Sequence, residues 1–321
     1  DLSPIPPGGL RILNLPPRNI EGSVIAPLAY RVQSSIPITA YQFNPLENVQ
    51  VFSNDASLLL PSNVLGKYYI AMGREQTFES LRGFMTIVAV RPGNTTVSVT
   101  VTAPTLASNE KDGTGQHIVP AMRPGDSRSF TLQQFEVLNI ETNATAADLT
   151  GTVVVADREV AVFGGSEASN VPNTNHCDFE RGVCAWQLAA GMPADQAKLC
   201  SSHDDCGSFI TCCADHLEEQ IFPVRTWGTR YIAAKSFDRN TESDAWRIMA
   251  AEDGTLVTTF PPQANIPVLN RGEWYEIESR EHFEIVSDRP ILVGQYLAAE
   301  QAPDPNVAGV PTHGGAGAGD P

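Results

Sequence analysis

Six cysteines are the residues whose type and spacing most directly predict a chemistry. They lie close together in an otherwise cysteine-free chain, at Cys177, Cys184, Cys200, Cys206, Cys212 and Cys213. An even number of clustered cysteines is typical of an insertion cross-linked by disulfides, although the sequence does not choose among the pairings. We expect the adjacent Cys212 and Cys213 to bond to different partners, because bridging neighbours strains the peptide. Disulfides also predict a location outside the reducing cytosol.

A metal site is the alternative interpretation of the same segment, because His176, His203 and His216 lie nearby. Structural zinc sites usually contain two short Cys-x2–4-Cys knuckles, and no interval between these cysteines has that length. Asp204 and Asp205 could hold Ca²⁺, but they lack the regular spacing of a calcium loop. We therefore predict disulfides, with no free thiol and no bound zinc.

A second polar group follows the cysteines. It consists of Asp215, His216, Glu218 and Glu219, with Trp227 a few residues further on. The structural interpretation, which we prefer, is a short capped helix over Asp215–Gln220 that packs Leu217 against a sheet. The alternative is a ligand-binding site, in which the carboxylates would suit Ca²⁺.

Motifs for catalysis or for cofactor binding are missing from the sequence. There is no G-x-S-x-G, H-E-x-x-H, P-loop or G-x-G-x-x-G motif, and the six histidines are scattered. The sequence therefore predicts a protein that is not an enzyme and that has no cofactor. A concealed hydrolase would require histidines and carboxylates that converge in a deep pocket.

Charge and hydrophobicity exclude two classes of partner. The formal net charge is −16 and the pI is about 4.7, which repels the phosphates of nucleic acids and anionic lipids. The longest apolar run, about Phe84 to Val90, is far shorter than the roughly 18 residues of a membrane helix. We expect neither nucleic-acid binding nor direct membrane insertion.

Hydrophobic patterns predict an almost entirely β-structured chain. Val97, Val99 and Val101 alternate with polar residues, as in a half-buried strand. The run Phe84–Val90 predicts a neighbouring strand, and the turn residues Arg91–Asn94 predict a hairpin between the two. Further strands are expected at Ser129–Leu132, Glu136–Glu141, Leu149–Ala156 and Glu159–Gly164. Pro193–Leu199 is the other candidate for a short helix.

Internal repetition is the strongest indicator of architecture. The segment Leu65–Ala71 resembles Trp227–Ala233, which begins 162 residues later, and Val153–Gly164 resembles Phe283–Gly294. Tyr30–Phe43 resembles the second pair, and we interpret the polar residues inside these segments as tight turns. These patterns predict two repeated antiparallel β-sandwich-like units with a disulfide-stapled insertion, and a β-propeller is the alternative.

The repeat suggests a division of the chain. The expected parts are N-terminal strands with a partial repeat copy (1–45), a first β unit (46–172), the cysteine-rich insertion (173–214), a second β unit (215–301) and a flexible tail rich in Gly, Ala and Pro (302–321). Neither end resembles a domain terminus, so we expect the chain to be part of a larger protein.

Three segments carry a resemblance to a known family: Ala214–Phe237, Val153–Asn173 and Ser287–Tyr296. Together with "SSIPITAYQFN" and "LLLPSNVLGKYYIA" near the front, they resemble the IgGFc-binding protein N-terminal domain family. The resemblance implies an extracellular β-rich module, and the preference for Arg over Lys favours a bacterial surface or secreted member. The insertion departs from the family, as do Ala168 and Ser169, where the family tends to have a cysteine.

The combined expectation is a non-enzymatic extracellular binding or adhesion module of a larger secreted or cell-surface protein. Its partner would be a protein or glycan at a cell surface, recognised by loops and by the insertion. Binding to antibody Fc is not transferred, because no binding residues can be matched one by one. The alternative is a structural spacer or assembly module that associates with itself through strand edges.

Overall fold

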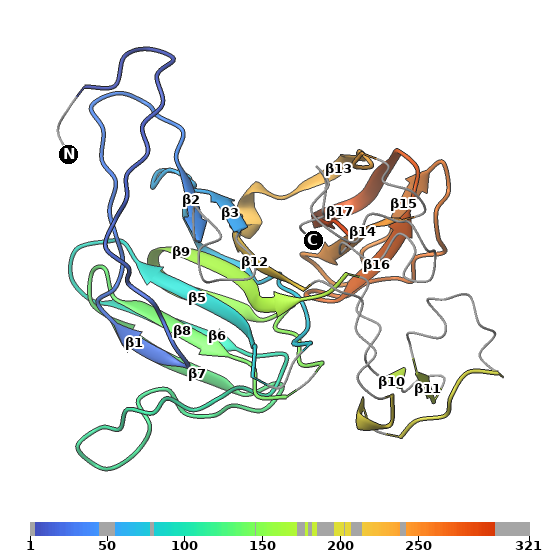
Figure 1. Cartoon of the computed structure of the whole chain (residues 1–321), viewed down its shortest axis with the longest axis horizontal. Helices are drawn as coiled ribbons and strands as arrows, with labels where there is room; N and C mark the ends of the chain where they lie inside the picture. The colour runs from blue at the N-terminus through green and yellow to red at the C-terminus, as the bar shows by residue number, and fades with distance from the viewer. Residues whose placement is uncertain are drawn as a thin grey trace, which may run out of the picture.

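Two β units and a small disulfide-bonded insertion make up the computed structural model of this chain (Figure 1). The structure describes residues 4–44, 55–77, 80–144, 146–171, 177–178, 182–184, 196–201, 203–206, 214–237 and 242–298. The described strands pair only in antiparallel fashion, and the helical elements among these residues are two short 3-10 turns. No helix in this part of the chain is long and apolar enough to cross a membrane.

The first unit is one eight-stranded sheet that folds over on itself. Its strands are β1 (Val24–Ala26), β4 (Gly66–Ile70), β5 (Gly83–Ala89), β6 (Thr95–Thr100), β7 (Ser127–Leu132), β8 (Val137–Glu141), β9 (Val153–Ser169) and β12 (Asp215–Gln220). The first half of β9 pairs with β4 and β6, whereas its second half pairs with β5 and β12. The two halves therefore belong to two layers, which enclose an apolar core that includes Met85, Ile87, Val99 and Val160.

The second unit repeats this plan with fewer strands. It contains β13 (Gly228–Ala233), β14 (Asp244–Ala250), β15 (Val257–Phe260), β16 (Trp274–Ser279) and β17 (Phe283–Tyr296). The first half of β17 pairs with β13 and β15, and its second half pairs with β14. Trp246, Ile248 and Ile285 lie in its core. The all-β fold with two repeated sandwich-like units is confirmed, and the propeller is not the arrangement of the described strands.

The remaining elements form two small ribbons and the 3-10 turns. β2 (Tyr41–Asn44) pairs with β3 (Asp55–Leu58) beside β12, and β10 (Cys177–Asp178) pairs with β11 (Val183–Cys184) inside the insertion. The 3-10 turns are η1 (His203–Cys206) and η2 (Val224–Thr226). β12 falls within the range predicted for the second unit, yet it pairs with β9 of the first unit.

A tyrosine fixes the bend of the shared strand in each unit. Residues 156–159 of β9 lie opposite Lys67 alone, so β9 contains a bulge. The Tyr69 hydroxyl fills the gap: it accepts from the Gly66 N–H at 2.8 Å and donates to the Val160 carbonyl at 2.7 Å. Tyr231 makes the same two bonds in the second unit, to Gly228 at 3.0 Å and Ile291 at 2.7 Å.

Two local predictions about strands are wrong. Phe84–Val90 and Asn94–Thr102 do not form a hairpin, because β9 lies between β5 and β6 and pairs with both. The polar residues within Val153–Gly164 do not form a tight turn either, because they form the bulge of one continuous strand. A bulge that moves a strand from one layer to the other accommodates polar residues as a turn does, so the same sequence pattern fits both.

The predicted helix over Asp215–Gln220 is also wrong, because these residues form strand β12. The capping pattern is weaker than the ladder that this segment forms with β9. Of the predicted helix Pro193–Leu199, residues 196–199 are described. They form a bend, and Leu199 bridges to Val183 rather than continuing a helix.

Candidate functional site

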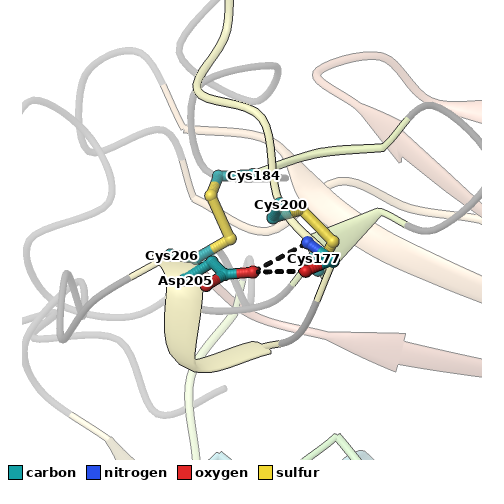
Figure 2. Close-up of a disulfide and its surroundings, with 6 residues drawn as sticks. Cys177, Cys184, Cys200, Asp205 and Cys206 are labelled. Atoms are coloured by element: carbon teal, nitrogen blue, oxygen red, sulfur yellow. Dashed lines mark hydrogen bonds between the residues drawn. A yellow bond between two sulfur atoms is a disulfide. The ribbon is translucent and has the colours of Figure 1, made fainter.

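Four of the predicted cysteines form two interlocked disulfides (Figure 2). Cys177 is bonded to Cys200 and Cys184 to Cys206, so the two loops overlap in sequence. Cys177 and Cys184 also face each other across β10 and β11. The carboxylate of Asp205 accepts hydrogen bonds from the backbone and side chain of Ser201, at 2.8 and 3.1 Å. Cys212 and Cys213 lie outside the described residues.

A metal interpretation of these cysteines does not fit the observed bonding. The sulfur atoms of Cys184, Cys200 and Cys206 lie within 4.8 Å of one another, and within the described ranges this is the one group of three or more metal-ligand atoms so close together. Each of these sulfurs is already bonded to another cysteine. The disulfide prediction is therefore confirmed for these four residues.

The predicted polar group does assemble, on the ribbon side of β12. We call it the β12 cluster and define it as Gln42, Asn44, Asp55, Ser57, His216, Glu218 and Glu219. The Gln42 amide donates to Glu218 at 2.5 Å and the Asn44 amide at 3.1 Å, while His216 lies 3.2 Å from the same Asn44 amide. Ser57 donates to Glu219 at 3.1 Å.

The surroundings raise the pKa of three members of the β12 cluster, Asp55, His216 and Glu219. Burial raises the pKa of Glu219 to about 7, against the hydrogen bond from Ser57, and burial also raises the pKa of Asp55. Burial disfavours charge on His216, but the hydrogen bond and the negative charge of Glu218 outweigh it and raise the pKa of His216. The ring of His216 stacks on Phe84, with ring centroids 5.9 Å apart.

Two predicted residues lie away from the polar centre of this cluster. Trp227 is 8% exposed and packs in the apolar core of the first unit, where its indole N–H donates to the Phe222 carbonyl at 3.0 Å. Asp215 is buried at the start of β12, opposite Ser169 of β9. The hydrogen bonds of the β12 cluster attach the ribbon of β2 and β3 to β12.

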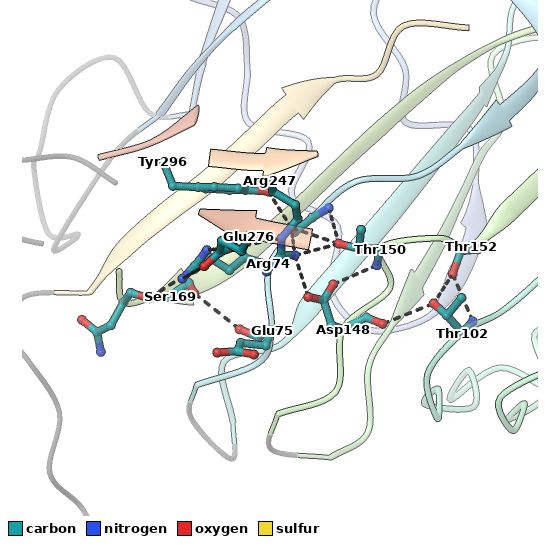
Figure 3. Close-up of polar contacts among 12 residues, drawn as sticks. Arg74, Glu75, Thr102, Asp148, Thr150, Thr152, Ser169, Arg247, Glu276 and Tyr296 are labelled. Carbon is teal, nitrogen blue, oxygen red and sulfur yellow. Dashed lines mark hydrogen bonds and ion pairs between the residues drawn. The ribbon is translucent and has the colours of Figure 1, made fainter. Parts of the chain in front are cut away.

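The boundary between the two units contains a buried polar network that the sequence did not reveal (Figure 3). Arg74 of the first unit donates two hydrogen bonds to Glu276 of β16, at 3.0 and 3.3 Å. Arg247 of β14 donates to Asp148 at 2.7 Å, to Thr150 at 2.9 Å and to Glu276 at 3.0 Å. Each unit thus supplies one arginine and one carboxylate to the other.

Aromatic rings and apolar side chains complete this boundary. The guanidinium of Arg247 lies 3.8 Å from the ring centroid of Trp274, and the Tyr296 hydroxyl donates to the Gly73 carbonyl at 2.7 Å. Met249 of β14 and Ala251, which follows this strand, belong to the apolar core of the first unit. The boundary is therefore continuous with a core and is not a loose contact between domains.

Charge in the network is held in place by mutual pairing. Burial alone would raise the pKa of Glu276, but the charges of Arg74 and Arg247 outweigh it and lower that pKa to about 2. Burial raises the pKa of Tyr296 to about 12. The backbones also approach closely: a Cβ on Gly151, whose φ is +90°, would lie 2.5 Å from the Gly272 carbonyl oxygen. A side chain at position 151 would therefore force the units apart.

An open groove of about 750 Å³ follows this boundary, and we call it the seam groove. Its walls come from three segments: residues 102–104 after β6, residues 146–148 and 150 between β8 and β9, and residues 267–269 and 272–274, of which the last begins β16. Val268 is 56% exposed on its rim, whereas the adjacent Leu269 is 3% exposed and anchors the wall. The loops of both units therefore converge on one surface, which no repeat pattern in the sequence could indicate.

Comparison with known protein families gives one match. The family described as IgGFc binding protein matches residues 55–181 and 198–321, which together span most of the chain. The unmatched residues between these ranges fall inside the insertion, where the sequence departs from the family pattern. A search of curated proteins gives no match. With both β units covered, the chain belongs to the IgGFc binding protein family.

Proposed function

We propose that this chain is a non-enzymatic extracellular binding module that uses the seam groove to hold an apolar segment of a protein partner at a cell surface. The observation that carries the proposal is the groove itself, whose walls come from loops of both units. Family membership and the two disulfides support an extracellular binding role.

The chemistry of the groove favours a protein segment over a sugar. Pro104, Ala146, Pro267 and Val268 line it, so much of its lining is aliphatic. Sugar sites usually combine an accessible aromatic face with several polar groups, whereas here one face of Trp274 is covered by Arg247. Rigid walls lower the entropic cost of binding, because the buried ion pairs beneath the groove fix both sides before a partner arrives.

The first test measures binding of the whole chain to purified antibody Fc and to a mucin glycoprotein, before and after enzymatic removal of its glycans. Val268→Arg places a charge on the groove rim and is expected to weaken binding at least tenfold. Leu256→Arg is the matched control, because Leu256 is also 56% exposed but is not among the groove residues. It should leave the affinity unchanged.

Three results would count against this proposal. Equal losses in both variants would show that the groove is not the site. Loss of binding after deglycosylation, with the protein intact, would identify a sugar as the ligand. The absence of saturable binding to any probe would count against a binding role.

A second candidate function is a rigid spacer within a surface protein. The buried network between the units favours it, because four charged side chains lock the relative orientation of two units that could otherwise hinge. A spacer needs no ligand, so the absence of binding to Fc and to the mucin would not count against this candidate.

A further inference from the structure

The segment before β2 is a third copy of the bulged strand found in both units. In β17, the Ser287 hydroxyl donates to the Arg289 carbonyl at 2.6 Å, and Pro290 follows. The Ser34 hydroxyl donates to the Ile36 carbonyl at the same distance, and Pro37 follows. The two segments therefore share the local fold of the bulge as well as its sequence pattern.

Among the described residues, no strand pairs with the part of this third copy that precedes β2. Aligned on the bulge, Val32 corresponds to Ile285, and Ile38 corresponds to Ile291. Ile285 and Ile291 are both 0% exposed, whereas Val32 is 50% exposed and Ile38 is 48% exposed. Apolar side chains that belong in a sandwich core are thus exposed along the N-terminal segment, as in a strand without its unit.

β2 contacts β3 as β9 contacts β12. The Leu59 N–H donates to the Ala40 carbonyl at 2.9 Å, and the Ile221 N–H donates to the Val162 carbonyl at 2.8 Å. Leu59 and Ile221 are 162 residues apart, which is the offset of the repeat. β3 and β12 are each followed by a proline, Pro61 and Pro223 respectively. The carbonyl of each proline accepts a hydrogen bond from the N–H of the residue three positions later. A last strand of one unit pairing with the first strand of the next is therefore a recurring joint.

The second half of β17 is the equivalent last strand without such a partner. Residues 292–296 pair with β14 on one side, and within the described part of the chain no strand pairs with their other side. β17 carries Ile291, Gln295 and Tyr296 where the N-terminal copy carries Ile38, Gln42 and Phe43. Backbone groups on an open edge form a template for a further strand.

We propose that two molecules of this chain bind head to tail, with the second half of β17 of one molecule pairing with β3 of the next in place of its own β2. In the monomer, β2 pairs with the edge of β3 until another molecule displaces it. The contact is heterologous, so repeated association builds an open filament rather than a closed dimer. This inference is independent of the seam groove.

β3 is bonded to β12 independently of β2, so β2 can dissociate while β3 stays in place. Side chains attach β3 to β12: Asp55 accepts from the Glu218 N–H, and the Ser57 hydroxyl accepts from the Gln220 N–H at 2.8 Å. Gln220 in turn accepts from the Leu60 N–H at 2.6 Å. None of these bonds involves β2, whose four residues are all exposed.

The incoming strand reproduces the backbone contacts of the departing strand and not its side-chain contacts. Gln42 of β2 donates to Glu218, whereas Gln295, at the equivalent position of β17, already donates to the Ala234 carbonyl at 3.1 Å and to Asp244 at 2.7 Å. Asn44 has Leu297 as its counterpart, so its contacts with Glu218 and with His216 are both lost. The exchange therefore keeps the backbone register, and main-chain hydrogen bonds supply its affinity.

Sedimentation of the full oxidised chain over a range of concentrations tests the exchange. The wild type should form dimers and longer chains as concentration rises. Tyr41→Cys with Leu58→Cys, which face each other across β2 and β3, should lock β2 in place and weaken association at least tenfold. Gln42→Pro removes a backbone N–H from β2 and should strengthen association at least tenfold. Tyr41→Cys alone is the control for the lock.

Mixed oxidation then identifies the contact. Molecules with Ser57→Cys, mixed with molecules with Gln295→Cys, should give a disulfide-linked heterodimer, whereas Thr131→Cys on β7 in place of Ser57→Cys should not. Monomers at every concentration for both wild type and Gln42→Pro would overturn the proposal. The proposal would also be overturned if the lock left association unchanged, or if the mixtures gave no heterodimer. In either case the edge of β17 would be covered by another segment, or the interface would lie elsewhere.

Discussion

Glu141 is a buried acid whose charge opposes the fold. It lies on β8 with 4% of its surface exposed, 3.3 Å from the Asn139 amide and 3.9 Å from the Arg82 guanidinium. Burial, together with the negative charge of Glu167, raises the pKa of Glu141 to about 7. Between its ordinary pKa of 4.5 and this value, the folded protein retains a proton that the unfolded chain releases. The free energy of unfolding therefore decreases as the pH rises through this window.

Glu141→Gln should remove that dependence. At pH 8 we expect the variant to be more stable than the wild type by about 2 kcal/mol, with little difference at pH 4. Urea unfolding at several pH values measures this, with the exposed Glu110→Gln as the control. An unchanged difference between wild type and Glu141→Gln at pH 4 and pH 8 would contradict the proposed protonation of Glu141.

The bulged strands β9 and β17 depend on a tyrosine each. In the first unit the Tyr69 hydroxyl, which is fully buried, satisfies one backbone N–H and one carbonyl that the bulge takes out of the ladder. Its counterpart Tyr231 is only partly buried. The same hydroxyl bonds therefore contribute more stability in the first unit than in the second.

Tyr69→Phe should lower the free energy of unfolding by about 1–3 kcal/mol, because it leaves two buried backbone groups unpaired. Tyr231→Phe should cost less. Tyr30→Phe is the control, because the Tyr30 hydroxyl makes an exposed hydrogen bond to the Pro16 carbonyl. Thermal unfolding of the three variants would measure the order, and an equal cost for Tyr30→Phe and Tyr69→Phe would refute the role of the bulge tyrosine.

Much of the fold was predictable at the level of elements, because alternation and repetition report directly on burial. Val97, Val99 and Val101 are inside as expected, and the repeat of Leu65–Ala71 marks equivalent strands β4 and β13. The prediction of connectivity was wrong. The residues Arg91–Asn94 do include a bend, but the strand that lies between β5 and β6 comes from far along the chain. Local sequence contains no record of such a long-range partner.

The candidate sites were predictable in unequal measure. Spacing alone predicted that the cysteines form disulfides, and the four described ones do. The residues of β12 were recognised as a polar group, but their partners Asp55 and Ser57 lie some 160 positions earlier. Nothing in the local sequence distinguishes Arg247 from an exposed charged residue on a strand. Its burial results from the packing of the two units.

The whole molecule is held together by ion pairs that cross between its units. Arg247 is fully buried, and its guanidinium meets Asp148 of one unit and Glu276 of its own. Burial opposes its charge, but these carboxylates outweigh that effect and raise the pKa of Arg247. A buried pair is costly to break from one side, because the remaining charge has no partner.

Arg247→Met should therefore destabilise the protein by about 3–5 kcal/mol. Arg230→Met is the matched control, because Arg230 forms an exposed pair with Glu284 and its loss should not change stability measurably. Urea unfolding monitored by tryptophan fluorescence measures both. If the two variants lose equal stability, the network between the units does not hold them together, and the rigid-spacer candidate loses its support.

The interlocked disulfides have a mechanical consequence for a chain pulled from its two ends. The bond between Cys177 and Cys200, which have a sequence separation of 23, gives tension a covalent path past the residues between them. At roughly 3.5 Å per extended residue, about 80 Å of contour length is withheld from stretching. Under load the insertion would thus behave as a short inextensible link between β9 and β12 of the first unit, and reduction would release that slack.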